Sequence, residues 1–367
     1  MKIIAQVKLN PTKEQAKTLR QTLELTNKAC NRISQLAFQL QTFKQYALHL
    51  RIYKQIREDF ALSSQIVVRA LAKVTDAYKL GTDKPRKFKL LGAIAYDARI
   101  LTWRTDKQFV TIWTLAGRQP IPYGCGQRQK ESLQFQQGES DLVYHKGNFF
   151  LLAVCDVPEP TEQEVEDVLG VDFGLVSLAA DSDGQTFTGG QIESKRSWYQ
   201  KRRAILQSVG TPSAKRRLKK LTGKQRRFQR DTNHRISKQL VAKAQDTNRA
   251  IALEELKGIR KRTTVRRKER AKHSNWAYFQ LRSFTEYKAR LAGVQVLKVD
   301  PRNTSRTCSA CGHCEKANRK SQPEFICKEC HYSINADLNA ALNTRSKAVV
   351  NTPMVSTLRS QKQAAAL

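Results

Sequence analysis

Two pairs of closely spaced cysteines constrain the fold of this chain more than any other feature. Cys308 and Cys311 form one Cys-x-x-Cys pair, Cys327 and Cys330 form a second, and 15 residues separate the pairs. Each pair makes a tight turn that directs two sulfurs at one point, and two such turns complete the tetrahedron that Zn2+ prefers. The sequence therefore predicts a structural zinc ribbon over residues 305–332.

The other cysteines and the nearby histidines leave alternatives to this ligand set open. Cys314 lies outside the spacing, and His313 and His331 could compete as ligands. A disulfide framework would need an oxidising compartment. The first residues lack the apolar core of a secretion signal, and no run approaches the roughly 18 apolar residues of a membrane span. We therefore expect no membrane partner. Three isolated cysteines are expected to be small buried hydrophobic residues, namely Cys30, Cys125 and Cys155.

The charge of the chain indicates a polyanionic partner. Lys and Arg number 66 against 32 Asp and Glu, which gives a net charge of +34 over 367 residues. Nucleic acid is the usual partner of such an excess. Residues 195–290 hold 30 Lys and Arg but 6 Asp and Glu, too few acids for an ordinary solvated helix face with alternating charges. The bases that we expect to contact phosphates are Arg216, Arg217, Lys219, Lys220, Arg226, Arg227, Arg266 and Arg267.

The first half of the chain reads as a β-barrel or sheet with a helical insertion. Residues 2–8 alternate as a strand does, and Thr12 is placed to cap a helix. Helical spacing continues with interruptions to about residue 78. Alternating apolar runs separated by turn residues fill residues 90–157, and a Pro- and acid-rich linker follows over 158–167.

The second half reads as an α/β domain that the ribbon interrupts. A buried strand with Asp172 precedes two long basic helices over 194–248. A short apolar strand over 250–256, a basic and mobile loop over 257–273, and an amphipathic helix over 274–293 follow. A last helix covers DLNAALN after the ribbon, and residues 346–367 read as a disordered tail.

Three acids stand out against this basic background. Asp172 and Glu254 lie in apolar strands and Asp337 begins the last helix, with spacings of 82 and 83 residues. A buried carboxylate is costly unless it is paired or binds metal. Asp172 alone could form a salt bridge, or act as the Mg2+-binding acid of a sugar-kinase-like ATPase. Together the three favour the RNase H arrangement, in which carboxylates hold two Mg2+ ions ~3.5–4 Å apart. Glu255 competes with Glu254, because both faces of that strand are apolar.

These motifs resemble the TnpB family, the OrfB-type proteins of insertion sequences, which are related to the compact type V CRISPR effectors. The resemblance rests on GVDFG, LEEL, GVQVLKVDPRNTSRTCSACG, ICKEC and ADLNAALN, and it is most specific over residues 168–343. It implies that Asp172, Glu254 and Asp337 are catalytic magnesium ligands. Asn335 is a departure, since relatives often carry an additional Asp there.

The resemblance also implies an α+β multidomain fold and a location in the prokaryotic cytoplasm, associated with the nucleoid. The implied domains are a wedge-type β-barrel (1–10 and 90–160), a helical recognition insertion (11–89), an RNase H-like RuvC domain (168–304 and 333–345) and the inserted zinc ribbon (305–332). The implied activity is Mg2+-dependent cleavage of double-stranded DNA, directed by a guide RNA transcribed from the element's own end. We favour a monomer.

Two other functions remain open from the sequence. A nuclease-inactive, RNA-guided repressor would keep the charge and the ribbon but lack one of the acids, and all three are present. A transposase that joins strands would share the chemistry of the acids. The chain shows no evident pair of histidines with a nearby tyrosine nucleophile, so we rank strand transfer below hydrolysis.

Overall fold

The computed structural model describes residues 1–161, 165, 167–174, 177–187, 190–255, 278–321 and 323–351. The chain divides into two compact units, Met1–Pro158 and Glu159–Leu367. Among the described helices, none combines the length and the apolar character that crossing a membrane requires. The expected mobile loop over 257–273 lies outside the described residues, as do Arg266 and Arg267.

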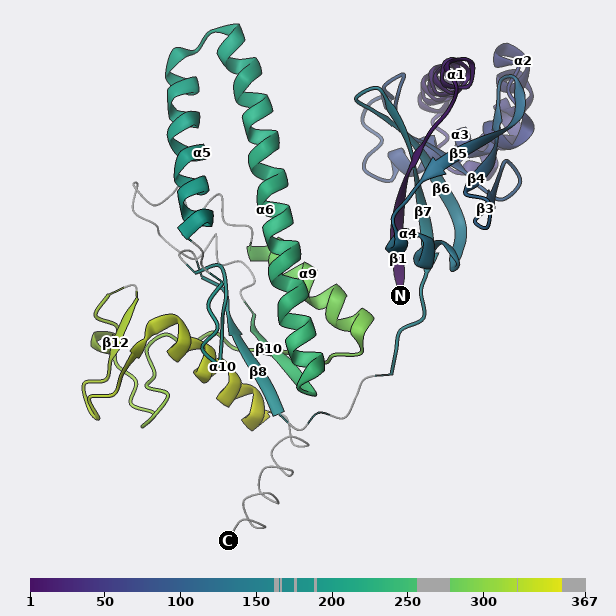
Figure 1. The fold of residues 1–367 in the computed structure, drawn as a ribbon. Coiled ribbons are helices and arrows are strands. Elements are labelled where there is room, and N and C mark those ends of the chain that lie inside the picture. The colour runs from purple at the N-terminus through teal and green to yellow at the C-terminus, as the bar shows by residue number, and fades with distance from the viewer. Residues whose placement is uncertain are drawn as a thin grey trace. The chain divides into compact units, whose positions relative to one another are not determined.

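The first unit is built on a seven-stranded antiparallel sheet with the order β2-β6-β7-β1-β5-β4-β3 (Figure 1). Trp103 on β3 donates from Nε1 to Oγ of Ser140 on β6 at 3.3 Å, and the Tyr96 hydroxyl on β2 donates to the carbonyl of Trp113 at 3.1 Å. These bonds cross the core between the two ends of the sheet, which is therefore a near-barrel. Its strands are β1 (Lys2–Leu9), β2 (Ile94–Tyr96), β3 (Leu101–Arg104), β4 (Phe109–Thr114), β5 (Gly117–Gly124), β6 (Gln136–His145) and β7 (Asn148–Asp156).

A three-helix insertion follows β1, as the sequence predicts. It comprises α1 (Lys13–Gln39), α2 (Gln45–Phe60) and α3 (Ser64–Tyr78). Thr12 caps α1, because its hydroxyl accepts from Gln15 N at 3.2 Å while the Gln15 side chain accepts from Thr12 N at 3.0 Å. The short helix α4 (Gln127–Leu133) was not predicted, since seven residues are too few to show a helical period.

The isolated cysteines of this unit follow the prediction in part. Cys30 and Cys155 are buried, whereas Cys125 is only half-buried.

The second unit has a four-stranded sheet with the order β11-β10-β8-β9, formed by β8 (Asp167–Asp172), β9 (Ala180–Asp181), β10 (Arg249–Glu254) and β11 (Val296–Val299). β8, β10 and β11 are parallel, and β9 is antiparallel to β8. Parallel neighbours need crossover connections. Here the crossovers contain α5 (Gly190–Val209) with α6 (Pro212–Asp246), and then α9 (Tyr278–Ala292).

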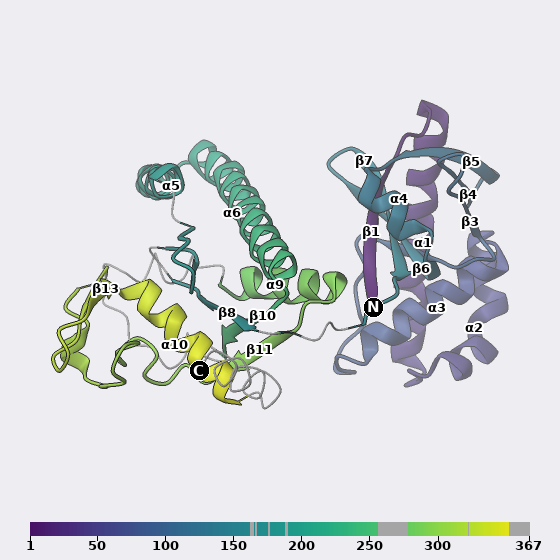
Figure 2. The same cartoon turned by 60° about the horizontal axis from the view of Figure 1, so that its bottom comes forward.

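Helices cover both faces of this second sheet, so the unit has three layers (Figure 2). Leu169 and Ile251 pack against α6 and α9 on one face. Val168 and Ala250 pack against α10 (Ala336–Asn351) on the other. Burial on both faces explains why β8 and β10 read as continuous apolar runs.

The two predicted basic helices are present, and they form a hairpin. Gly210 turns the chain between them with a φ of +65°, a left-handed conformation that glycine adopts without strain. Tyr199 on α5 contacts Phe228 on α6, with ring centroids 6.3 Å apart.

Helix α10 extends further than the sequence indicated. Residues 346–351 were assigned to the disordered tail, and this was wrong. The helix continues to Asn351 because Ala348 and Val349 add apolar side chains to the face that packs on β8 and β10. Arg345 also pairs with Asp167 at 2.6 Å. Residues 352–367 lie outside the described part of the chain.

Gly170 permits the close approach of α10 to β8 and generates the first prediction. A Cβ at this position would meet the carbonyl oxygen of Ala341 and lie 2.6 Å from the backbone nitrogen of Arg345. Because backbone atoms cannot move aside as a side chain can, we expect Gly170→Ala to lower the free energy of unfolding by about 1–3 kcal/mol or more. Denaturant unfolding measures this loss as a lower free energy of unfolding in the transition of the second unit.

Gly223→Ala is the matched control. Gly223 lies within α6 and a Cβ there would meet only the end of the Arg227 side chain, at 3.6 Å. Alanine is favoured over glycine in a helix by about 1 kcal/mol, so this variant should be neutral or more stable. Equal stability of both variants would contradict the close packing of α10 on β8.

Candidate active site and metal centre

The three predicted acids end or begin three neighbouring elements. Asp172 is the last residue of β8 and Glu254 is the last residue of β10. Their preceding residues, Val171 and Leu253, are partners in the parallel register, so the two carboxylates leave the sheet at the same edge. Asp337 is in the first turn of α10, which packs on β8. Residues far apart in the sequence thus meet at one end of the sheet.

The acids interact electrostatically. Burial raises the pKa of Asp172, and the carboxylates of Glu254 and Asp337 raise it further. Burial also raises the pKa of Glu254. Removing a charge from water is unfavourable and a like charge adds to that cost, so Asp172 and Glu254 are ionised together at this edge only at a cost that a bound cation would lower.

Arg319, which the sequence analysis did not single out, brings positive charge to this edge. Its guanidinium lies 3.7 Å from Oδ1 of Asp337 and acts to lower the pKa of Asp172. Arg319 belongs to the segment between the two cysteine pairs, so the ribbon contributes a residue to the acid cluster. Its place there depends on how the ribbon docks, which no local sequence signal encodes.

The structure separates Glu254 from Glu255. Glu254 is 8% exposed, and its Oε1 accepts a hydrogen bond from the Thr304 hydroxyl at 2.5 Å. The Glu255 carboxylate accepts from Arg282 on α9 at 3.2 Å. Glu254 therefore lies with Asp172, whereas Glu255 forms an ion pair with a neighbouring helix.

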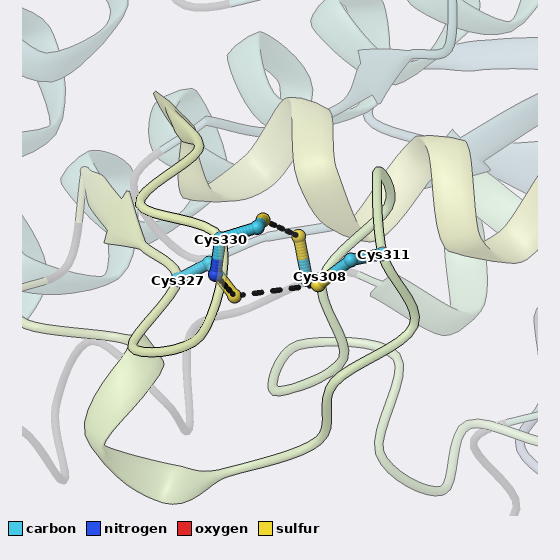
Figure 3. A group of neighbouring side chains, drawn as sticks. All are labelled: Cys308, Cys311, Cys327 and Cys330. Carbon is cyan, nitrogen blue, oxygen red and sulfur yellow. Dashed lines mark hydrogen bonds between the residues drawn. The ribbon is translucent and has the colours of Figure 1, made fainter.

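The four predicted cysteines form a compact cluster (Figure 3). Their sulfurs all lie within 4.8 Å of one another, with 3.7 Å between Cys308 and Cys330 and 3.6 Å between Cys311 and Cys327. A tetrahedral site with Zn–S bonds of about 2.3 Å has S···S edges of about 3.8 Å. Within the described residues, this is the one group of three or more potential ligands that is so close. The three acids are spread more widely.

The backbone of each Cys-x-x-Cys turn explains how the sulfurs converge. Gly312 and His331, each just after the second cysteine of a pair, have φ values of +80° and +56°. This left-handed conformation reverses the chain. In each turn a backbone hydrogen bond involves the first cysteine. Gly312 N donates to the Cys308 carbonyl in the first turn, and Cys327 N donates to the Tyr332 carbonyl in the second.

The alternative ligands do not join this cluster. Cys314 is exposed and lies in an isolated β-bridge with Thr307. His313 has its Nε2 3.4 Å from a carboxylate oxygen of Glu315. His331 forms the second turn, and neither histidine belongs to the group of close ligand atoms.

Two buried asparagines on α10 fasten the start of the ribbon. Asn343 donates from Nδ2 to the carbonyls of Thr304 and Thr307, at 2.8 and 2.7 Å. Asn339 donates to the Thr307 carbonyl at 2.8 Å and accepts from Ser309 N at 3.0 Å. The sequence analysis missed this role, although Asn339 and Asn343 are four residues apart and therefore lie on one face of the helix.

Asn335 caps this helix. Its Oδ1 accepts from the backbone nitrogens of Asp337 and Leu338, at 2.9 and 3.2 Å. Asn and Asp are both favoured caps, so the departure at this position preserves the start of α10 and the placement of Asp337.

The predicted phosphate contacts that the structure describes lie on α6. Their side chains are exposed along the part of α6 that pairs with α5, and they are Arg216, Arg217, Lys219, Lys220, Arg226 and Arg227. Residues 194–230 hold 14 Lys and Arg and not one Asp or Glu.

Comparison with known proteins identifies both halves of the second unit. Residues 152–260 match the OrfB_IS605 family, described as a probable transposase, and residues 278–344 match the Cas12f1-like TNB domain. The chain is 29% identical over 230 residues to the "CRISPR-associated endodeoxyribonuclease Cas12f1" of Sulfoacidibacillus thermotolerans, covering 57% of this chain and 53% of that protein. It is 31% identical over 210 residues to the "Putative RNA-guided DNA endonuclease InsQ" of Escherichia coli, covering 50% of this chain and 51% of that protein.

A TnpB-like protein of Methanocaldococcus jannaschii is 33% identical over 132 residues, which cover 36% of this chain and 47% of that protein. The chain thus spans about half the length of these relatives. It aligns over 94% of its length with the chain of a Cas12f1–sgRNA–target DNA complex, at 18% identity and a TM-score of 0.40. The family matches and the relatives agree with the motifs around Asp172, Glu254 and the ribbon, and together they support the TnpB family for this chain.

Proposed function

We propose that this chain is an RNA-guided DNA endonuclease of an insertion sequence, which hydrolyses DNA phosphodiesters at the cluster of Asp172, Glu254 and Asp337. The observation that carries the proposal is the meeting of these three acids at one sheet edge, beside a hairpin with an unbroken excess of positive charge. The names of the relatives support it, since they include RNA-guided DNA endonuclease and CRISPR-associated endodeoxyribonuclease.

The proposed nuclease domain is RNase H-like, of the RuvC type. Three parallel strands with an antiparallel neighbour and helices on both faces are compatible with it. In this assignment residues 168–304 and 333–345 form the nuclease and residues 305–332 the ribbon. The near-barrel of the first unit takes the wedge role, and its helical insertion over residues 11–89 takes the recognition role.

The donor set at the acid cluster suits magnesium. Mg2+ prefers carboxylate oxygens, and the unfavourable proximity of the three acids would be relieved by cations. When bound, such ions activate water and stabilise the leaving oxygen.

The chain's own residues supply the geometry of the reaction. Thr304 fixes one carboxylate oxygen of Glu254, and the cap at Asn335 fixes the turn that carries Asp337. Arg319 lies where its guanidinium can pair with a phosphate oxygen of the bound strand. The exposed bases of α6 would hold backbone phosphates of the guide RNA and of double-stranded target DNA without reading sequence.

We assign structural Zn2+ to the cysteine cluster. Four thiolates fill the coordination shell and leave no position open for catalysis. Because Asn339 and Asn343 tie the ribbon to the helix of Asp337, the metal would stabilise the acid site indirectly.

Removal of a cysteine ligand tests the zinc assignment. Cys308→Ser and Cys330→Ser should each lower bound zinc and thermal stability together, because binding of structural zinc contributes directly to folding. Cys314→Ser is the matched control, since this exposed cysteine lies outside the cluster. Metal analysis of the purified chain and its unfolding midpoint measure both effects. A protein with no zinc, or one that loses zinc with Cys314, would contradict the assignment.

Substitution of the acids tests the catalytic assignment. The RNA that co-purifies with the chain is sequenced, and a plasmid that matches it serves as the substrate with Mg2+. Asp172→Ala, Glu254→Ala and Asp337→Ala should each abolish cleavage, while affinity for the target persists because pairing and the basic hairpin supply it. Glu255→Ala is the matched control and should remain active, since Glu255 is paired with Arg282.

The outcomes of this assay separate the competing functions. Full cleavage by Asp172→Ala or Asp337→Ala would overturn the site. Activity lost in Glu255→Ala but kept in Glu254→Ala would move the ligand by one residue. Binding without cleavage by the natural chain would indicate a repressor, and joined strands in place of hydrolysed ends would indicate a transposase.

A further inference from the structure

One face of α5 carries exposed apolar side chains. Trp198, Ile205 and Val209 are 55%, 52% and 55% exposed. Their spacings of seven and four residues place them on one side of the helix, and Arg202 falls on the same side. The Trp198 indole meets the Tyr199 ring edge-on, with centroids 5.1 Å apart, and Tyr199 contacts Phe228 on α6. These contacts hold the indole in place while Trp198 stays 55% exposed.

The charge around this stripe restricts what can cover it. Residues 194–230 of the hairpin hold 14 Lys and Arg and no Asp or Glu. A second copy of this chain would bring the same positive charge and would be repelled. A partner must therefore combine negative charge with flat apolar surface. Unpaired nucleic acid has both, because its phosphates are negative and its bases stack on aromatic rings. A duplex hides its bases and offers only phosphates.

The position of α5 favours DNA over RNA as the single-stranded nucleic acid on this surface. The hairpin begins at Gly190, soon after β8 ends at Asp172, and Figure 1 draws the first turns of α5 above that end of the sheet. A strand that passes the acid cluster can therefore continue along α5. In the proposed function the strand at the acids is DNA.

We infer that the stripe of Trp198, Arg202, Ile205 and Val209 is a binding surface for single-stranded DNA, with a base stacked on the Trp198 indole. Arg202 pairs with a phosphate, and Ile205 and Val209 cover the apolar parts of further nucleotides. The stripe adds an aromatic contact to the charge of α6, and it discriminates unpaired from paired DNA. Its assignment to the DNA strand rests on the proposed function, whereas the stacking surface itself does not.

Substitution of Trp198 tests this surface in the full chain. Fluorescence anisotropy measures the affinity for a labelled single-stranded DNA and for a blunt duplex of the same length, at one salt concentration. Trp198→Ala should weaken single-strand binding about 5- to 150-fold, the range for loss of one base–aromatic stack, and leave duplex binding unchanged. Trp198→Phe should recover most of the affinity, because phenylalanine also stacks.

Two matched variants complete the test. Phe279→Ala removes another exposed aromatic ring, 78% exposed on α9, and should change neither affinity. Joint replacement of Arg216, Arg217, Lys219 and Lys220 by Gln should weaken single-strand and duplex binding alike, because phosphates occur in both.

Three results would overturn the inference. They are an unchanged single-strand affinity of Trp198→Ala, an equal loss on the duplex, and a greater loss on single-stranded RNA of the same sequence, which would assign the stripe to the guide. The test is separate from the proposed function, since it needs no cleavage. If the predicted discrimination is found in a chain that does not cut DNA, the stacking surface stands and the nuclease proposal falls.

Discussion

The close packing of α10 on β8 is the contact on which the acid site depends. Gly170 leaves room for the helix backbone, and Arg345 pairs with Asp167 at the start of the strand. The helix then delivers Asp337 to the end of the sheet and, through Asn339 and Asn343, holds the entry to the ribbon. One helix–strand contact thus positions an acid and the metal-binding ribbon together.

The electrostatics of the acid cluster favour a bound proton or a cation. Burial and the neighbouring carboxylates raise the pKa of Asp172, so its ionised form carries a cost at this edge that positive charge lowers. Arg319 offsets part of it. Perturbed pKa values of this kind cluster at functional sites, and the proposed function uses the positive charge of the hairpin to hold phosphates.

Much of the site could be predicted from the sequence, because the relevant signals are local. The spacing of the cysteines predicts the four-cysteine cluster. The apolar strands that end in Asp172 and Glu254 predict that acids gather at one edge of the sheet. The choice between Glu254 and Glu255 could not be made, since both faces of β10 are buried and period-two counting fails. Arg319, Asn339 and Asn343 escaped notice because their partners are set by how the ribbon docks. The sequence analysis ended α10 too early, because two apolar residues, Ala348 and Val349, are too few to indicate a buried helix face.

The central claim is that the acids form one divalent-metal site, and direct counting of bound Mn2+ tests it. Electron paramagnetic resonance reports free Mn2+ and therefore the number bound per chain, without cleavage. The account predicts specific binding of two ions, lost in Asp172→Ala and kept in Glu255→Ala. Undiminished Mn2+ binding by Asp172→Ala would contradict it.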